Sequence, residues 1–441
     1  MKELYEPGQQ MYDMMRRLWP ICRSITGDGV RQTLSILREQ LPEMDTHEVP
    51  TGTSCFDWEV PKEWSINDAY ILAPDGSKVL DFSHSNLHVV NYSVPVDLEI
   101  DLTDLQPHLH SLPNQPNAIP YVTSYYCEDW GFCLSHTVRE KLLPGRYRIK
   151  IDSQLRDGNL TFGELKIPGK SNCEVLISTY ICHPSMANNE LSGPCLAWGL
   201  AHWLRALPNR NYSYRILFLP ETIGAIYYIS RHLEALKDRT IAGFVMTCVG
   251  DERAWSFMPS RRGNTLADNV SRHVLKHLAP QFKEYSYLDR GSDERQYCSP
   301  GVDLPVVSVM RSKYVTYPEY HTSLDNMELV TAVGLEQSYF IHQKILEVLE
   351  GDCVPIYRIP CEPKMSKRGL RPTIGKVGSA NESRDMMNLL AYADGTMSLL
   401  EISELIGTPA WKLIEIATVL KNHNLLCLNR FTGRRVSKTQ P

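Results

Sequence analysis

A continuous apolar run, Val175 to Ile181, most constrains how this chain can fold, because it has the length of a buried strand. It ends two residues before His183, and a helical pattern follows over Pro194 to Arg205. Buried strands next to helices are typical of parallel sheets that helices cover on both faces. In such sheets, ligands bind at the carboxyl ends of the strands. We therefore expect His183 to lie at the floor of a binding site.

The same alternation continues from residue 172 to about residue 351. The predicted strands are 175–181, 214–219, 241–249 and 304–310, and the predicted helices include 223–236, 267–278 and 329–349. Strands that alternate with helices predict an α/β domain with a largely parallel sheet. Residues 1–55 look mainly helical, with patterns at 11–19 and 30–38, and we assign them to the same domain.

Two flanking regions have different patterns of predicted secondary structure. Residues 56–153 contain short β-type runs such as 69–72, 87–92 and 147–152, which predict an inserted β-rich domain. The aromatic run 121–132 favours core packing, with a rim over the active site as the alternative. In residues 363–441, helical patterns at 382–393, 398–406 and 408–422 precede a predicted hairpin with its turn at Thr432-Gly433, an order typical of a winged helix.

Composition excludes several classes of protein. The chain of 441 residues is 43% hydrophobic and 22% charged, and its longest apolar runs are too short to cross a bilayer. The first residues lack the apolar core of a signal peptide. The twelve cysteines are scattered, without a C-x-x-C pair, which indicates reduced thiols. We expect a cytoplasmic protein without a membrane partner.

Polar side chains that could carry chemistry follow the predicted strands. His183, Glu221 and Asp251 follow the first three, and His321 follows the fourth at a distance. Two imidazoles with oxygen ligands suit Zn²⁺, and a nearby glutamate can take a proton from bound water. Each residue also has a structural interpretation, because a buried histidine is often only hydrogen-bonded and Glu221 could favour a helix dipole.

The order of these motifs resembles the co-catalytic zinc aminopeptidases, which have a mixed, mostly parallel sheet of the phosphorylase/hydrolase-like type. Asn189-Glu-Leu-Ser-Gly193 is similar to that family's Asp-Asn-x-Ser-Gly, whose aspartate bridges two metals. Glu221-Thr222 stands where the family has a general base followed by a ligand glutamate, and Thr247 stands where it has an aspartate ligand. Ser292-Asp293 and Tyr320-His321-Thr322 resemble its late motifs.

The resemblance is closer to bacterial aminopeptidase-like proteins associated with polysaccharide biosynthesis. The matching segments are 23–31, 56–64, 86–93, 130–133, 182–185 and 320–322. This resemblance implies that residues 154–355 form a peptidase-like domain, with the inserted β-rich domain and the C-terminal winged helix attached to it.

The chain departs from the zinc aminopeptidases at the acidic ligands. Asn189, Thr222 and Thr247 are neutral where that family has carboxylates. We therefore expect one zinc ion rather than two, bound by His183, Asn189 and His321, with Glu221 as the catalytic base. Acidic side chains that could support this site are Glu190, Asp251, Asp293 and Glu294.

Two functions remain open at this point. The first is a metal-dependent, aminopeptidase-like hydrolase that cleaves an amide or N-terminal aminoacyl bond of a small molecule or short peptide. The second is an inactive scaffold that binds or regulates through its winged helix. Residues 361–441 hold 12 Lys and Arg against 7 Asp and Glu, and helix 408–422 has Lys412 and Lys421 as its basic residues. This weak charge disfavours nucleic acid as a partner without excluding it, and a homo-oligomer is also compatible.

Overall fold

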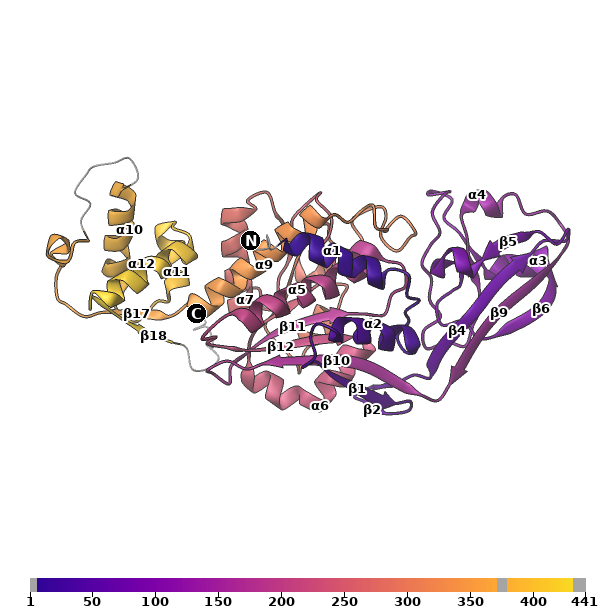
Figure 1. The fold of residues 1–441 in the computed structure, drawn as a ribbon, viewed down its shortest axis with the longest axis horizontal. Helices are drawn as coiled ribbons and strands as arrows, with labels where there is room; N and C mark the ends of the chain where they lie inside the picture. The colour runs from indigo at the N-terminus through magenta and orange to yellow at the C-terminus, as the bar shows by residue number, and fades with distance from the viewer. Residues whose placement is uncertain (1–5, 371–378, 431–441) are drawn as a thin grey trace.

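The computed structural model describes residues 6–370 and 379–430, which form three regions along one long axis (Figure 1). An eight-stranded mixed sheet with its helices lies in the middle, a four-stranded antiparallel sheet at one end and a helical C-terminal unit at the other. Among the described residues, no helix has both the length and the apolar character needed to span a bilayer.

The central sheet confirms the predicted α/β class. Its strands, in spatial order, are β1 (Asp45–Pro50), β10 (Asn159–Ile167), β12 (Ser213–Leu219), β11 (Glu174–Tyr180), β13 (Thr240–Val245), β16 (Val306–Met310), β14 (Ser256–Met258) and β15 (Lys283–Glu284). The middle four strands run parallel, and all seven residues of β11 are buried between β12 and β13. The strand predicted at 241–249 is shorter, because the chain leaves the sheet after Val245 and Cys248 has a φ of 53°.

Helices cover both faces of this sheet. One face packs against α1 (Pro7–Leu18), α2 (Asp28–Arg38), α5 (Ser192–Ala206), α7 (Leu266–Leu278) and α9 (Ala332–Gly351). The other face packs against α6 (Ile223–Arg239) and the short α8 (Glu294–Tyr297). Figure 1 shows α6 on the side opposite to α2 and α5. Each face therefore has its own apolar core, as expected for a parallel sheet.

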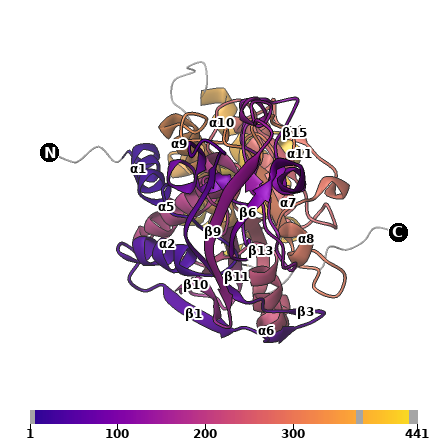
Figure 2. The same ribbon diagram turned by 90° about the vertical axis from the view of Figure 1, so that its right-hand side faces the viewer.

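The inserted region projects from the end of the central sheet. Its four-stranded sheet has the order β5 (Lys78–Asp81), β4 (Glu63–Leu72), β9 (Arg146–Arg156), β6 (Val96–Asp101). Smaller elements are β2 (Ser54–Cys55), β3 (Trp58–Glu59), α3 (Leu102–Leu105), β7 (Leu109–His110), β8 (Phe132–Cys133) and α4 (His136–Arg139). The view down the long axis shows β9 in front of the helices of the central domain (Figure 2). The strand predicted at 87–92 was wrong: a 3₁₀ turn occupies 86–88, and Val89 and Asn91 make only isolated bridges.

The C-terminal unit contains the three predicted helices. Its elements are β17 (Val354–Tyr357), α10 (Ser379–Tyr392), α11 (Leu399–Ile406), α12 (Ala410–Asn422) and β18 (Leu426–Asn429). β18 pairs antiparallel with β17, so this two-stranded sheet begins before the first helix. Ser398 and Glu401 form a capping box that starts α11. The hairpin turn predicted at Thr432-Gly433 lies outside the described residues.

The start of α5 gives a test of how tightly this fold is packed. A Cβ on Gly193 would lie 2.2 Å from the carbonyl oxygen of Met246, a backbone atom that cannot turn away. We expect Gly193→Ala to lower the free energy of unfolding by about 2 kcal/mol, measured by urea denaturation. Gly199→Ala in the same helix is the matched control, because there the nearest atom is the flexible Met11 sulfur. Equal effects of the two substitutions would contradict this packing argument.

Candidate active site

The carboxyl ends of the parallel strands open into a cavity of about 340 Å³. The side chains that line it come from the central domain and from the inserted region: Ile25, Trp58, Tyr121, Thr123, Tyr125, Tyr126, Cys182, His183, Glu221, Thr222, Arg295 and His321. Because β11 and β12 are adjacent and parallel, the residues that follow them meet at one edge of the sheet. The cavity thus lies where the strand pattern of the sequence places a binding site.

His183 follows β11 and is held by carboxylates on both sides of its ring. Its Nδ1 lies 2.7 Å from Oε2 of Glu190, and its Nε2 lies 3.7 Å from Oε2 of Glu221. Burial, and to a lesser extent the charge of Arg23, lowers the pKa of His183 to about 3. The imidazole is therefore neutral at physiological pH, with one nitrogen directed at Glu190 and the other toward Glu221.

A single π-helical turn, Ala187–Leu191, carries both Glu190 and Asn189. The carboxylate of Asp325 accepts the backbone N–H groups of Asn188 and Asn189, at 2.6 and 3.0 Å. Turns of this kind are frequent at functional sites, because the wider winding changes the direction of consecutive side chains. Here Glu190 reaches His183 and Asn189 reaches His321.

Arg23 is a component of the site that sequence reasoning missed. Its guanidinium is fully buried, Nε donates to the carbonyl oxygen of His183 at 3.0 Å, and the same atom lies 3.6 Å from Oε1 of Glu190. Burial raises the pKa of Glu190 to about 8, although the charge of Arg23 acts in the opposite direction. Burial also lowers the pKa of Arg23. Loss of hydration therefore outweighs the attraction within this pair.

His321 reaches the cavity from the long loop after β16, at a left-handed backbone position with φ of 55°. Its Nε2 lies 3.2 Å from Oδ1 of Asn189, and its ring centroid lies 5.5 Å from that of His183. Burial lowers its pKa to about 3. The structure thus brings together the two histidines and the asparagine that the sequence nominated as metal ligands.

The inserted region covers the two histidines. The ring centroid of Tyr121 lies 5.1 Å from those of both His183 and His321, and the Tyr121 N–H donates to the carbonyl oxygen of His321 at 2.8 Å. Tyr125 and Tyr126 also line the cavity. The first part of the aromatic run 121–132 therefore forms a wall of the cavity, which was the less favoured of the two interpretations of that run.

Glu221 lines the same cavity and follows β12. Its N–H donates to the sulfur of Cys182 at 3.2 Å, and 20% of its side chain remains exposed. Burial, followed by the negative charge of Asp293, raises the pKa of Glu221 well above its ordinary value. A carboxylate with a raised pKa is a stronger proton acceptor than an exposed glutamate.

Thr222 and Asp293 form a fixed support behind Glu221. Thr222 has a φ of 65°, and its N–H donates to Oδ1 of Asp293 at 2.8 Å. Its hydroxyl accepts a hydrogen bond from Nη2 of Arg295 at 2.6 Å. Burial raises the pKa of Asp293 to about 7, and its Oδ2 is buried without a hydrogen-bond partner.

Two predicted supporting residues lie outside this cavity. Asp251 accepts hydrogen bonds from the side chain of Asn188 at 3.0 Å and from the backbone of Ser312 at 2.9 Å. Glu294 accepts the Gly291 N–H at 2.8 Å and the Tyr314 hydroxyl at 2.5 Å. Both carboxylates therefore hold loops in place and do not reach the two histidines.

The donor set fits one metal ion and not two. Neutral His183 and His321 and the amide oxygen of Asn189 are nitrogen and oxygen donors of the kind that Zn²⁺ accepts. The hydroxyls of Thr222 and Thr247, which stand at the other ligand positions, are bonded to Arg295 and Tyr180. Burial raises the pKa of the Cys182 thiol well above its ordinary value, and the Cys182 sulfur accepts the Glu221 N–H at 3.2 Å.

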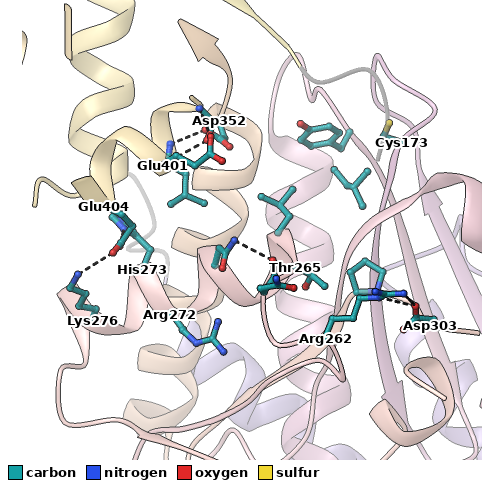
Figure 3. Close-up of a pocket in the computed structure, with 18 of the residues that line it drawn as sticks. Cys173, Arg262, Thr265, Arg272, His273, Lys276, Asp303, Asp352, Glu401 and Glu404 are labelled. Carbon is teal, nitrogen blue, oxygen red and sulfur yellow. Dashed lines mark hydrogen bonds and ion pairs between the residues drawn. The ribbon is translucent and has the colours of Figure 1, made fainter. Parts of the chain in front are cut away.

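A second cavity, of about 760 Å³, lies between the central domain and the C-terminal unit (Figure 3). Charged groups on its lining pair with one another, including Arg262 with Asp303 and Lys276 with Glu404. His273 contacts Glu404 through Nδ1 and accepts the Ala410 N–H through Nε2 at 2.8 Å, so neither nitrogen is available for a metal. We therefore assign the candidate active site to the smaller cavity.

Comparisons with known proteins identify the family and the fold. Residues 12–352 match the family described as "Domain of unknown function (DUF4910)", and residues 356–427 match a winged helix-turn-helix family. A Clostridium acetobutylicum protein is 42% identical over 96% of this chain and 97% of its own length. That protein is provisionally named a polysaccharide biosynthesis protein with an aminopeptidase-like domain.

Solved structures show the same fold. A crystal structure of a provisionally assigned peptidase from Clostridium acetobutylicum is 41% identical, with a TM-score of 0.90 and 96% coverage of both chains. A zinc aminopeptidase from Bacillus subtilis is 14% identical, with a TM-score of 0.54, and the match covers 78% of this chain and 95% of that one. The second similarity shows a shared aminopeptidase-type fold and nothing about chemistry.

The raised pKa of Glu190 gives a test with a definite sign. A carboxyl group whose pKa rises on folding stabilises the folded state at low pH and loses that contribution as pH rises toward about 8. In metal-free protein, we expect Glu190→Gln to gain stability relative to wild type between about pH 5 and 8, by at most about 1.4 kcal/mol per pH unit. Urea denaturation at several pH values measures this.

Glu39→Gln, at the exposed Arg17–Glu39 pair, supplies the background pH dependence. If wild type instead gained stability relative to Glu190→Gln as pH rose, the attraction of Arg23 would outweigh the burial of Glu190.

Proposed function

Because the chain belongs to the DUF4910 family and its cavity joins two neutral histidines to a carboxyl group, we propose that it is a metal-dependent, aminopeptidase-like hydrolase. Its reaction is the cleavage of an amide or N-terminal aminoacyl bond in a small or modified substrate. The observation that carries the proposal is the position of Glu221, whose carboxylate lies 3.7 Å from Nε2 of His183 at the carboxyl end of the sheet.

One zinc ion is the cofactor that these residues suit. His183, His321 and Asn189 would hold it, and Glu190 would orient His183 by accepting its Nδ1–H. When bound, zinc polarises a carbonyl group and lowers the pKa of water. The side chain of Asn189 brings no negative charge. A bound dication would favour the ionised form of Glu190, which would then supply charge that the ligands themselves lack.

Glu221 is the proposed general base. Its raised pKa allows it to take a proton from water and to return it to the departing amine. The partly exposed side chain opens on the cavity, and the Cys182 sulfur and the Asp293 carboxylate behind it fix the orientation of this segment. These contacts hold Glu221 in one orientation, as expected for a general base and not for a mobile surface carboxylate.

The dimensions of the cavity support a small substrate. A volume of about 340 Å³, walled by Tyr121, Tyr125, Tyr126 and Trp58, is at the lower end for a small-molecule site. The relative from Clostridium acetobutylicum is named for polysaccharide biosynthesis, and we extend that setting to this chain as the source of its substrate.

A scaffold without catalysis is the second candidate. Thr222 and Thr247 are neutral and hydrogen-bonded within the protein, which favours a site that has lost ligands. In that case the winged helix would carry the function by binding protein or nucleic acid. The metal and activity measurements that follow separate the two candidates.

Metal content tests the ligand assignment. We expect protein purified without an affinity tag to contain about one zinc ion per chain by elemental analysis, and His321→Ala to lose most of it, because a ligand nitrogen is removed. His84→Ala, at an exposed position in the inserted region, is the control and should retain the metal. Unchanged zinc in His321→Ala would remove this histidine from the ligand set.

Activity tests the role of Glu221. We expect Glu221→Gln to retain zinc and to lower kcat on an aminoacyl or amide substrate by about a hundredfold or more, because the amide cannot accept a proton. A panel of aminoacyl 4-nitroanilides and N-acyl amino acids provides the assay. A Glu221→Gln variant with wild-type turnover would show that another group is the base.

A further inference from the structure

Arg295 is the cationic side chain on the lining of the catalytic cavity. Of the other lining residues, His183 and His321 are imidazoles, Glu221 is acidic, and the remainder are apolar, hydroxyl or thiol side chains. Arg295 belongs to the first turn of α8, two residues after Asp293, so it enters the cavity beside the support of the general base. A positive charge at this place needs a partner.

Most of the hydrogen-bonding capacity of Arg295 is unused. Nη2 donates to the Thr222 hydroxyl at 2.6 Å, Nε is buried without a partner, and Nη1 makes no hydrogen bond to the described residues. Within residues 6–370 and 379–430, no carboxylate forms an ion pair with this guanidinium. By contrast, Arg215 lies between Glu164 and Glu174, and Arg253 makes a two-pronged pair with Glu319.

The surroundings hold Arg295 in place for an external partner. Thr222, to which it donates, is itself fixed by Asp293, and the Thr222 hydroxyl proton has no acceptor among the described residues. A guanidinium nitrogen and a hydroxyl that lie 2.6 Å apart can donate together to the two oxygens of one carboxylate. Arginine is the side chain best suited to this planar recognition.

The charges nearby favour a singly charged group. Glu221 and Asp293 both interact electrostatically with Arg295, so a group bound by this guanidinium lies near two acidic side chains. A phosphate would bring a second negative charge next to these two carboxyl groups, which like-charge repulsion opposes. A carboxylate matches the single charge of the guanidinium.

We propose that Arg295, together with the hydroxyl of Thr222, binds a carboxylate of the substrate, so that the cavity selects amides that carry a free carboxylate near the scissile bond. N-acyl amino acids and dipeptides belong to this class. The selection of a substrate presupposes the proposed hydrolase function, but binding of the carboxylate can be measured without turnover.

Two probes that differ in one group test the proposal. N-acetylglycine carries the carboxylate, and N-acetylglycinamide replaces it with a neutral amide. Their affinities for the full-length protein are measured by ligand-observed NMR titration. We expect the acid to bind about tenfold more tightly or better, because a charge-assisted pair is added.

Variants assign this preference to Arg295. Arg295→Gln should abolish the preference for the acid, and Arg295→Lys should retain part of it, because the charge remains and the planar fork is lost. Arg290→Gln is the matched control, an exposed arginine of the same segment that stacks on Tyr287 outside the cavity, and it should bind like wild type. Thermal unfolding shows whether each variant is folded. If Arg295→Gln does not fold, Arg295→Lys still tests the proposal.

Several outcomes would overturn the proposal. These are equal affinity of wild type for the two probes, absence of acid binding, an unchanged preference in Arg295→Gln and Arg295→Lys, or tighter binding of N-acetylaminomethylphosphonate than of N-acetylglycine. A protein that hydrolyses neutral and anionic amides equally well keeps the proposed function and loses this inference. A protein that binds the acid through Arg295 and hydrolyses nothing keeps the inference and loses the proposed function.

Discussion

The burial of β11 between two parallel neighbours is the constraint on which the rest of the structure depends. Every residue of β11 is buried, and its backbone is paired with β12 on one side and β13 on the other. Because the three strands share one direction, the segments that leave them must meet at one edge. His183, Glu221 and Thr247 are neighbours for this reason, although they are far apart in the sequence. The helices bury both faces of the sheet, and the inserted region contributes Tyr121, Tyr125 and Tyr126 to the cavity at this edge.

Sequence reasoning located the parts of the site that depend on strand periodicity. His183 and Glu221 were predicted from their positions after apolar runs, and the structure places them 3.7 Å apart. It could not show that Glu190 and Asn189 would face different histidines, because that depends on the π-helical winding of one turn. The sequence also could not show that Asp251 lies outside the cavity. Asp251 follows a strand as His183 and Glu221 do, but it accepts hydrogen bonds from Asn188 and Ser312.

The two arginines escaped prediction for different reasons. Arg23 lies in a segment whose glycine and aspartate residues indicate a turn, and its contact with Glu190 joins residues far apart in the sequence. Arg295 stands in a polar run that also suits a solvated turn, and its lack of an ion pair with any described residue is visible only in the folded structure. Periodicity reports which face of an element is buried, whereas the partner of a buried charge is decided by tertiary contacts.

The likeness to zinc aminopeptidases concerns the scaffold, and the chemistry depends on the replaced residues. With carboxylates absent at 189, 222 and 247, the site has lost most of the negative charge that a second dication would need. At position 222, where those enzymes have a ligand glutamate, the Thr222 hydroxyl accepts a hydrogen bond from the guanidinium of Arg295. The lining of the cavity thus holds two histidines, one glutamate and one arginine where the zinc aminopeptidases have carboxylate ligands.

The backbone bridge between Pro120 and Thr322 joins the inserted region to the loop that carries His321. The Tyr121 N–H also bonds the carbonyl oxygen of His321, so the wall of the cavity and this histidine belong to one mechanical unit. A displacement of the wall by an entering molecule must therefore be transmitted to His321. In this architecture, the width of the entrance and the geometry of the histidine pair cannot be adjusted independently, and mutations that reshape the wall will also move His321.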